Sequence, residues 1–576
     1  MGTTTSISDG WARLLPWLGA LIGVLWFLVV GGGPTLDPTN LDWLGGGDRA
    51  AHVLGWLHFR DAPWGFPLGR APSLMHPLTM TVALADANPW VALALKPFSQ
   101  WLPRDFQYIG PWLALCFALQ GWMGVKLMEL LTPGVSQRLL GAALFVLAPV
   151  LLQRAGMGHD TLCAQWMIIA MFWLYLRPRE DAKTAWRALG WALLLNVLAA
   201  GIHPYLVVMN FPIALALLFT AVRRERHLSW RWAGAALVGG SLAIGAVFVA
   251  FGYVGQGVRS GASGFGFFSA NVLALVNPAG WSYVLPGLPS GRGQYEGFGY
   301  LGTGVLGLAV LLLWRPWSWW PQAKAELKAR RPLVLMVLAL TALAFSSVVM
   351  VAGWTVLSMR QLVAPLLPVL ETFRSSGRFI WPLHYAVLMG CIALVVWRWR
   401  QRPAVATSVL LGAVILQVLD AGDFWERACF RGEPWPRLRA PEWASVDPLY
   451  RHIVLFPPFI VGSEEPCVQG TFREDDHARF GDLAYRQGLT TNSGYAARLD
   501  AANIRAVCQS LRADVESGRL AEDTLYVVDA PERARFQRLS PDVTCGMLDG
   551  FTVCVAAKEG KFREALMRAP PVPVSQ

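Results

Sequence analysis

Long apolar runs separated by short polar loops dominate the chain up to about residue 420. A helix that spans a membrane needs roughly 17 to 25 mainly apolar residues, and runs of about this length recur along this part. The pattern predicts an all-α polytopic membrane domain with about eleven transmembrane helices. The expected spans are residues 13–31, 108–131, 137–154, 160–176, 187–202, 204–222, 232–252, 298–314, 332–352, 378–397 and 403–420.

The pattern changes after about residue 421, where charged residues become frequent and long apolar runs end. Short β-branched runs and one amphipathic segment follow, which is typical of a small α/β domain. We therefore expect a membrane domain over residues 1–420 and a soluble domain over residues 421–576. The expected elements of the soluble domain are strands at 451–456, 524–529 and 551–557 and a helix at 501–517.

Lys and Arg are distributed unequally between alternate loops, and short cytoplasmic loops are the ones enriched in these residues. The basic set comprises the loops around residues 177–187, 223–231, 315–331 and 398–402. We therefore expect the N-terminus in the cytoplasm of a bacterium, the chain in the inner membrane and the C-terminal domain in the periplasm. Two long loops, residues 31–107 and 253–297, then face outward.

The composition agrees with a membrane protein and does not indicate nucleic-acid binding. Hydrophobic residues make up 54% and charged residues 15% of the chain, whereas a soluble domain has about 25% charged residues. The formal net charge is +11. Because many Lys and Arg lie in the loops that set membrane orientation, we do not interpret this charge as a signal for nucleic-acid binding.

Two cysteines flank a strong turn signal in the C-terminal domain. Asp549-Gly550 is typical of a two-residue β-hairpin turn, and Cys545 and Cys554 lie symmetrically about it. Counting outward, the two cysteines face each other at a closely spaced pair of positions, at a distance that suits a disulfide. We predict this bridge. Cys467 and Cys508 are a second candidate pair, which leaves Cys429 unassigned; free thiols are the alternative.

The first outward loop contains the strongest candidate for catalysis. Asp48 follows three glycines after the first expected span, and His52 would share its face if the segment were helical. Asp48 could act as a general base; the pair could equally be metal ligands or a structural ion pair. Asp86, further along the loop, is either a helix N-cap or a second catalytic carboxylate.

Further ionisable residues lie at outward ends of the expected spans. His159, Asp160 and His203 could bind a substrate, although Asp160 could also cap a helix and a lone His is more often structural. Tyr295 and Glu296 lie between glycines, where Tyr could stack on a sugar and Glu could bind a hydroxyl; an interfacial turn is the alternative. No ligand spacing is diagnostic of a metal, so a divalent cofactor stays an open question.

Arg374 and Arg378 lie in RSSGRF, at the start of the tenth expected span. Arg binds phosphate through two parallel hydrogen bonds. Both arginines lie on the side that the positive-inside rule depletes, which argues against a role in topology. We therefore expect a phosphate-binding role, above all for Arg378.

This layout resembles the GT-C superfamily of membrane glycosyltransferases, through an outward acidic loop after the first span, about eleven spans and an outward C-terminal domain. The stretches DWLGGGDRAAHVLGWLHFRDAPWGFPLG, NPAGWSYVLPGLPSGRGQYEGFGYLG and RSSGRFIWP also resemble a family of bacterial polytopic proteins. The GT-C resemblance implies a polyprenyl-phosphate-linked sugar donor, a glycan, lipid or protein acceptor, and Asp48 as the base. Many GT-C members have paired acidic residues there, whereas Arg49 follows Asp48, so Asp86 is expected to supply the second carboxylate.

Two other functions fit the same layout. A transporter or flippase for a glycolipid would place charged residues along a path in mid-span, and the expected spans contain few. A non-catalytic assembly protein of the cell envelope would present the C-terminal domain and would not need outward Asp, His and Arg residues.

Overall fold

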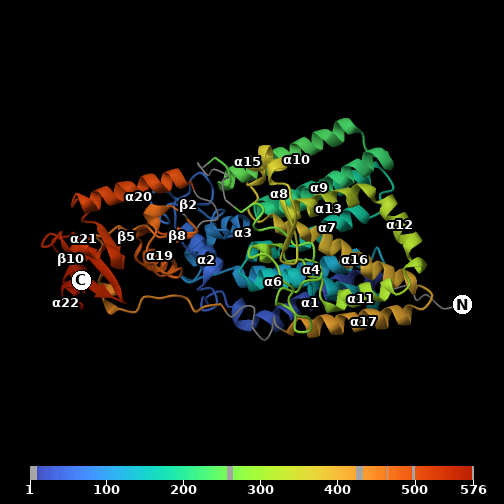
Figure 1. The fold of residues 1–576 in the computed structure, drawn as a ribbon, viewed down its shortest axis with the longest axis horizontal. Coiled ribbons are helices and arrows are strands. Elements are labelled where there is room, and N and C mark those ends of the chain that lie inside the picture. Colours follow the sequence, from blue (N-terminus) through green and yellow to red (C-terminus); the bar gives the residue numbers. More distant parts are fainter. Residues whose placement is uncertain (1–8, 256–263, 423–431, 464, 496–499, 574–576) are drawn as a thin grey trace. The chain divides into compact units, whose positions relative to one another are not determined.

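The computed structural model describes residues 9–255, 264–422, 432–463, 465–495 and 500–573. This part of the chain forms two compact units, and neither is continuous in sequence (Figure 1). The first unit contains residues 9–38, 108–246 and 264–422, and the second contains residues 39–107, 247–255 and the described residues from 432 onward. This division differs from the expected cut near residue 421, because most of the first outward loop folds with the C-terminal residues.

The first unit is helical, and each expected span overlaps a helix, at least in part. Figure 1 shows that many of these helices run side by side. They are α1 (Asp9–Gly31), α4 (Ile109–Met128), α5 (Val135–Val146), α6 (Pro149–Gly156), α7 (Trp166–Leu176), α8 (Ala182–Ala200), α9 (Pro204–Phe219), α10 (Trp230–Phe251), α11 (Thr303–Leu313), α12 (Trp320–Ala329), α13 (Arg331–Phe345), α16 (Trp381–Arg398) and α17 (Pro403–Asp420).

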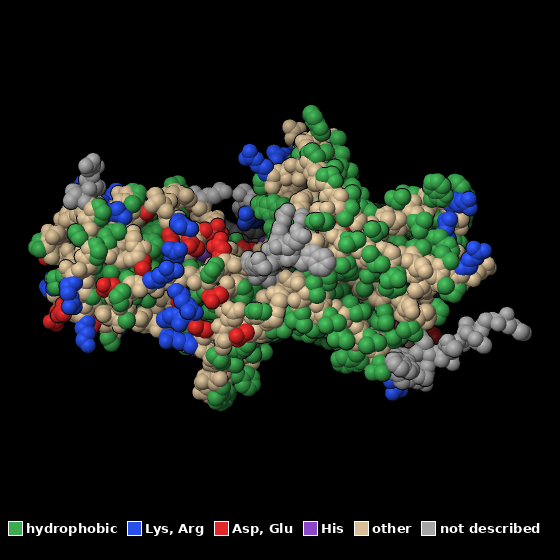
Figure 2. Space-filling view, turned by 90° about the horizontal axis from the view of Figure 1, so that it is seen from below, with side chains coloured by type: hydrophobic (Ala, Val, Ile, Leu, Met, Phe, Trp, Pro, Cys, Tyr) green, Lys and Arg blue, Asp and Glu red, His purple; other side chains and the backbone are tan. Residues whose placement is uncertain are grey.

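Within the described residues, six helical segments are long and apolar enough to cross a membrane. Several other expected spans coincide with shorter apolar helices, so the total of eleven stays a prediction. The six segments are Arg13–Gly31, Val135–Gly156, Pro204–Arg224, Trp230–Phe251, Ser376–Arg398 and Pro403–Asp420. On the face that Figure 2 shows, hydrophobic side chains cover much of the helical part, as expected of helices that contact lipid.

The expected span 332–352 is partly wrong. Helix α13 ends at Phe345, and Ser346 adopts a positive φ of 64° that terminates it. The next residues form the antiparallel hairpin of β3 (Val348–Val351) and β4 (Trp354–Ser358). β-Branched valines favour a strand over a helix, so an apolar run of this composition need not continue the helix.

Small residues bring the first two long helices into contact. A Cβ atom added at Gly19 of α1 would lie 2.5 Å from the carbonyl oxygen of Gly121 on α4, and one at Gly23 would lie 2.0 Å from that of Phe117. Helices in membranes associate through such close backbone packing. The glycines therefore fix the position of α1 against α4.

The second unit contains a five-stranded mixed sheet in the order β10-β11-β9-β5-β7. Strand β5 is parallel to β9 and β7, whereas β9, β11 and β10 are antiparallel neighbours. The expected strands and helix of this domain are present. The elements are β5 (His452–Phe456), α19 (Asp476–Gln487), β7 (Thr490–Thr491), α20 (Ala501–Glu516), β9 (Thr524–Val528), α21 (Arg533–Gln537), β10 (Thr544–Leu548), β11 (Phe551–Val555) and α22 (Lys561–Arg568).

Both candidate cysteine pairs of this unit form disulfides. Cys545 and Cys554 are register partners across the β10–β11 hairpin, with their Cα atoms 4.1 Å apart. Asp549 and Gly550 have φ values of 50° and 83°, as a primed hairpin turn requires. Cys467 is bonded to Cys508. Cys429 lies outside the described residues.

The first outward loop supplies α2 (Gly47–Arg60), α3 (Pro89–Leu95) and the 3₁₀ helix η2 (Lys96–Trp101) to this second unit. Helix α2 packs against α19: Nε2 of His58 donates to the carbonyl oxygen of Gly481 over 3.0 Å. The ends of α2 and η2 cap each other. Arg60 donates to the carbonyl oxygens of Ser99 and Leu102, and Lys96 donates to those of Phe59 and Ala62.

Candidate functional site

A buried ion cluster in the first unit joins three segments that are far apart in sequence. The carboxylate of Glu296 accepts hydrogen bonds from Nε and Nη2 of Arg378, each over 2.9 Å. Nη1 of Arg154 donates to the same carboxylate over 2.7 Å. Arg154 is fully buried, and Glu296 and Arg378 expose less than a tenth of their surface. Two guanidinium groups thus share one carboxylate.

Glycines explain how Glu296 reaches Arg378. Glu296 lies in the 3₁₀ helix η5 (Gln294–Gly297), and Arg378 lies in η8 (Ser376–Ile380). A Cβ atom at Gly377 would lie 2.6 Å from the Cα atom of Gly297, and one at Gly297 would lie 2.4 Å from the Cα atom of Ala270. No larger residue fits at this contact without movement of the backbone, so the glycine next to each charged residue allows the ion pair to form.

Arg154 reaches the cluster from α6 and contacts a neighbouring histidine. Its Nη1 atom lies 2.8 Å from Nδ1 of His159, and its Nη2 atom donates to the carbonyl oxygen of Glu296 over 2.9 Å. A guanidinium group can only donate hydrogen bonds. Nδ1 of His159 is therefore the acceptor of this hydrogen bond.

Two guanidinium groups meet one carboxylate in this cluster. Burial by itself raises the pKa of Glu296, but Arg378 and Arg154 oppose it and hold the pKa well below its usual range. Glu296 is therefore an anion, and two guanidinium groups share its carboxylate. Buried guanidinium groups of this kind attract anions.

Aromatic rings and one exposed arginine surround the cluster. The guanidinium of Arg378 lies 5.1 Å from the ring centroid of Tyr205, and the Tyr205 hydroxyl accepts a hydrogen bond from the backbone N–H of Ser375 over 2.8 Å. Tyr295 is 43% exposed. Arg374 is exposed and lies 4.8 Å from the ring centroid of Phe268. Tyr295 and Arg374 are thus the accessible members of the predicted group.

Two other candidates from the same unit have identifiable structural roles. Nδ1 of His203 accepts from the backbone N–H of Tyr205 over 3.1 Å and caps the N-terminus of α9. Asp160 is buried in the first turn of η3 (Asp160–Cys163), and its backbone carbonyl accepts from Nε1 of Trp112 over 2.9 Å. His203 therefore has a structural role as a helix cap. Asp160 lies in the first turn of η3, and His159 occupies the N-cap position of that helix.

The remaining candidates lie in the second unit. Asp48 is half-buried in the first turn of α2, where the helix dipole favours a carboxylate. Nε2 of His52 lies 3.7 Å from Oδ2 of Asp86. The structure therefore brings His52 next to Asp86, although more than thirty residues separate them in the sequence. The distance suits an ion pair when the imidazole is protonated.

A glycine again permits this approach. A Cβ atom at Gly55 would lie 2.6 Å from the Cβ atom of Ala85, so the turn that carries Asp86 packs directly on α2. Gly55 is three residues after His52, which places both on one face of the helix. Asp86 has a positive φ of 52° and is not a helix cap, because α3 has Asn88 at its N-cap.

The candidates thus form two groups, one in each unit. Glu296, Arg378, Tyr295 and Arg374 belong to the first unit, and Asp48, His52 and Asp86 belong to the second. Whether both groups line one cavity stays a prediction. Among the residues that the structure describes, no group of three His, Cys, Asp or Glu side chains could hold a metal ion.

Sequence reasoning missed Arg154 as a site residue. The signal was present, because the predicted topology puts Arg154 on the outward side, which the positive-inside rule depletes. The same argument singled out Arg378. Only the fold reveals that both arginines bind one carboxylate 142 residues from Arg154 and 82 residues from Arg378.

The fold defines a helical membrane protein with a C-terminal domain that contains a β-sheet. The chain belongs to the family described as Domain of unknown function (DUF6311), which matches residues 20–422. The DUF6311 C-terminal domain matches residues 442–556. No curated protein compared with the chain matches it.

Proposed function

We propose that this protein is an inner-membrane glycosyltransferase that transfers a sugar from a polyprenyl-phosphate donor to an acceptor on the periplasmic side. The observation that carries the proposal is the buried pair of guanidinium groups that meet at the carboxylate of Glu296. A lipid phosphate is the anion that such a centre at a membrane face would meet, and Arg is suited to bind it. The resemblance to GT-C enzymes supports the same donor class.

In this proposal the arginines act on the leaving group. Arg378 and Arg154 stabilise the negative charge that develops on the departing phosphate, because fixed positive groups in a site of low dielectric act strongly on such charge. Glu296 holds both guanidinium groups in place. Arg374, which is exposed, first attracts the donor phosphate, and Tyr295 offers its ring to the sugar.

Asp48 is the proposed general base. The acceptor hydroxyl gives its proton to the Asp48 carboxylate while its oxygen attacks the anomeric carbon of the donor sugar. The bond between that carbon and the phosphate oxygen breaks, and polyprenyl phosphate leaves. The His52–Asp86 pair, at 3.7 Å, is proposed to bind the acceptor.

The test measures release of polyprenyl phosphate by the full-length protein in proteoliposomes supplied with polyprenyl-phosphate hexoses or pentoses. Asp48→Asn should lower the rate by about 100-fold or more, as loss of a general base does. Asp42→Asn is the matched control, because Asp42 is an exposed carboxylate of the same loop, and this variant should keep the wild-type rate.

One result would contradict the assignment of Asp48 as the base, and a different result would contradict the transferase proposal. Full activity of Asp48→Asn would remove Asp48 as the base while leaving the transferase proposal intact. Movement of intact sugar lipid across the bilayer without release of polyprenyl phosphate would instead identify a flippase.

A further inference from the structure

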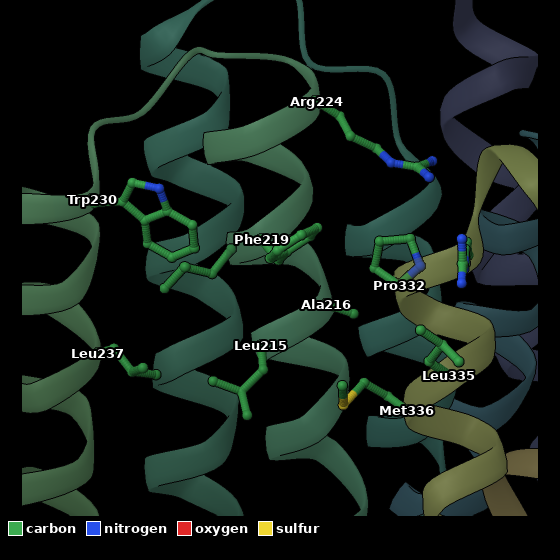
Figure 3. Close-up of a pocket in the computed structure, with 11 residues that line it drawn as sticks. Leu215, Ala216, Phe219, Arg224, Trp230, Leu237, Pro332, Leu335 and Met336 are labelled. Carbon is green, nitrogen blue, oxygen red and sulfur yellow. The ribbon is translucent and has the colours of Figure 1, made fainter.

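A separate pocket lies in the first unit between α9, α10 and α13, and it includes none of the candidate site residues (Figure 3). Its volume is about 560 Å³, within the range of roughly 300 to 1,000 Å³ that is usual for ligand pockets. Apolar side chains form most of its wall, and two arginines complete it. The lining residues are Leu215, Ala216, Leu218, Phe219, Arg224, Trp230, Leu237, Arg331, Pro332, Leu335 and Met336.

The pocket exists because α10 stands away from its neighbours. Only 11% of the most apolar stretch of this helix is buried, compared with 72% for the corresponding stretch around α9. Leu237 of α10 and Leu215 of α9 face the space between the two helices in Figure 3. A gap of this kind between apolar helices in a bilayer has hydrocarbon as its compatible occupant.

The two arginines give the pocket a charged end. Arg224 follows α9, and its guanidinium donates to the backbone carbonyl oxygens of Ala329 and Lys328, which leaves other N–H groups of its five for a ligand. Arg331 begins α13, is exposed and forms no hydrogen bond or ion pair with the described residues. Its neighbour Arg330 differs, because it is paired with Glu326.

We propose that this pocket binds one anionic phospholipid, with the phosphate on Arg224 and Arg331 and an acyl chain along Leu215, Leu237 and Met336. Charge complementarity selects this occupant, since an apolar slot that ends in two cations matches a hydrocarbon chain that ends in an anion. Both arginines belong to the loops predicted to be cytoplasmic. The lipid would therefore come from the inner leaflet, opposite the proposed transferase site, and the inference does not depend on that proposal.

The test uses the full-length protein in detergent and native mass spectrometry. Phosphatidylglycerol should remain bound as one molecule per chain, whereas phosphatidylcholine should bind roughly ten-fold more weakly, because its choline ammonium cancels the net negative charge that the two arginines attract. Arg224→Gln/Arg331→Gln should remove this preference. Arg315→Gln/Arg402→Gln is the charge-matched control, because both of these arginines are exposed on the same predicted side and lie outside the pocket.

A second variant tests the apolar part without changing charge. Leu335 is 49% exposed and lines the pocket, so Leu335→Trp can fill it without disturbing a packed core and should displace the lipid. Equal retention of the two lipids, or unchanged binding by Arg224→Gln/Arg331→Gln, would overturn the proposal. Displacement of the lipid by inorganic phosphate at millimolar concentration would also overturn it, because it would mark a plain anion site.

Discussion

Arg378 holds the carboxylate of Glu296 with two parallel hydrogen bonds, each 2.9 Å long, and Arg154 binds the same carboxylate from a different helix. Glu296 is thus the common partner of two buried cations. This relationship determines how each of the three residues should respond to substitution.

Glu296→Gln should destabilise the protein more than Arg378→Gln does. The first substitution removes the carboxylate that two buried guanidinium groups share, and breaking a buried ion pair costs about 3 to 5 kcal/mol. The second leaves Glu296 still paired with Arg154. Thermal unfolding in detergent measures the difference, and Glu371→Gln, which changes a carboxylate without a hydrogen bond or ion pair to the described residues, is the control. A smaller loss for Glu296→Gln than for Arg378→Gln would contradict the shared-carboxylate arrangement.

Gly377→Ala should destabilise the same cluster through the backbone alone. The added methyl group would lie 2.6 Å from the Cα atom of Gly297, so η8 would have to move away from η5. Gly390→Ala is the matched control, because a Cβ atom at Gly390 of α16 has no neighbour within 4 Å and alanine favours a helix by about 1 kcal/mol. The unfolding temperature should fall for Gly377→Ala and stay level or rise for Gly390→Ala. Similar effects of both changes would argue against a tight contact at Gly377.

The second unit should lose stability in mild acid because of His58. Burial lowers the pKa of His58 from 6.5 to about 4. The unfolded chain therefore binds a proton that the folded chain does not accept between these values, and stability falls as the pH decreases from 6.5 to about 4. Since one pKa unit corresponds to about 1.4 kcal/mol, the loss amounts to about 3 kcal/mol.

Denaturation of the full-length protein at pH 7.5 and pH 5 should show about 2 kcal/mol of this loss, because pH 5 lies about 1.5 units below the unfolded pKa; His58→Gln is measured for comparison. The neutral His58 ring bonds to Ser73 and Gly481 over 2.8 and 3.0 Å, and Gln can replace part of this bonding without titrating. The pH dependence should be weaker in His58→Gln than in wild type. An identical dependence would exclude His58 as its source.

The sequence predicted those features that depend on local pattern. Apolar run length located the helices, and the symmetric spacing of Cys545 and Cys554 about Asp549-Gly550 located a disulfide, because hairpin register follows from the turn. The length of the apolar run predicted a helix that is too long at Val348 and Val349, because these β-branched residues form a strand after α13.

Contacts between segments that are distant in the sequence could not be predicted from the local sequence pattern. His58 bonds to Gly481, which is 423 residues away, and Arg486 pairs with Asp105 over 2.8 Å across 381 residues. Such pairs assign the first outward loop to the second unit, and no periodicity along the chain records them. The pairing of His52 with Asp86 has the same character, since it depends on a turn that packs against α2.

Binding of polyprenyl phosphate to the buried ion cluster of Arg154, Glu296 and Arg378 is the most direct test of the proposed function. Native mass spectrometry of the full-length Arg224→Gln/Arg331→Gln protein removes the contribution of the pocket beside α10. This protein should retain polyprenyl phosphate and release uncharged polyprenol. Adding Arg378→Gln should weaken the binding of polyprenyl phosphate by roughly ten-fold or more, as loss of a charge-assisted hydrogen bond does. Adding Arg292→Gln, which changes an exposed arginine four residues before Glu296, should leave it unchanged. Two results would contradict a phosphate-binding role of the cluster: retention of polyprenol equal to that of polyprenyl phosphate, or full retention of polyprenyl phosphate after Arg378→Gln.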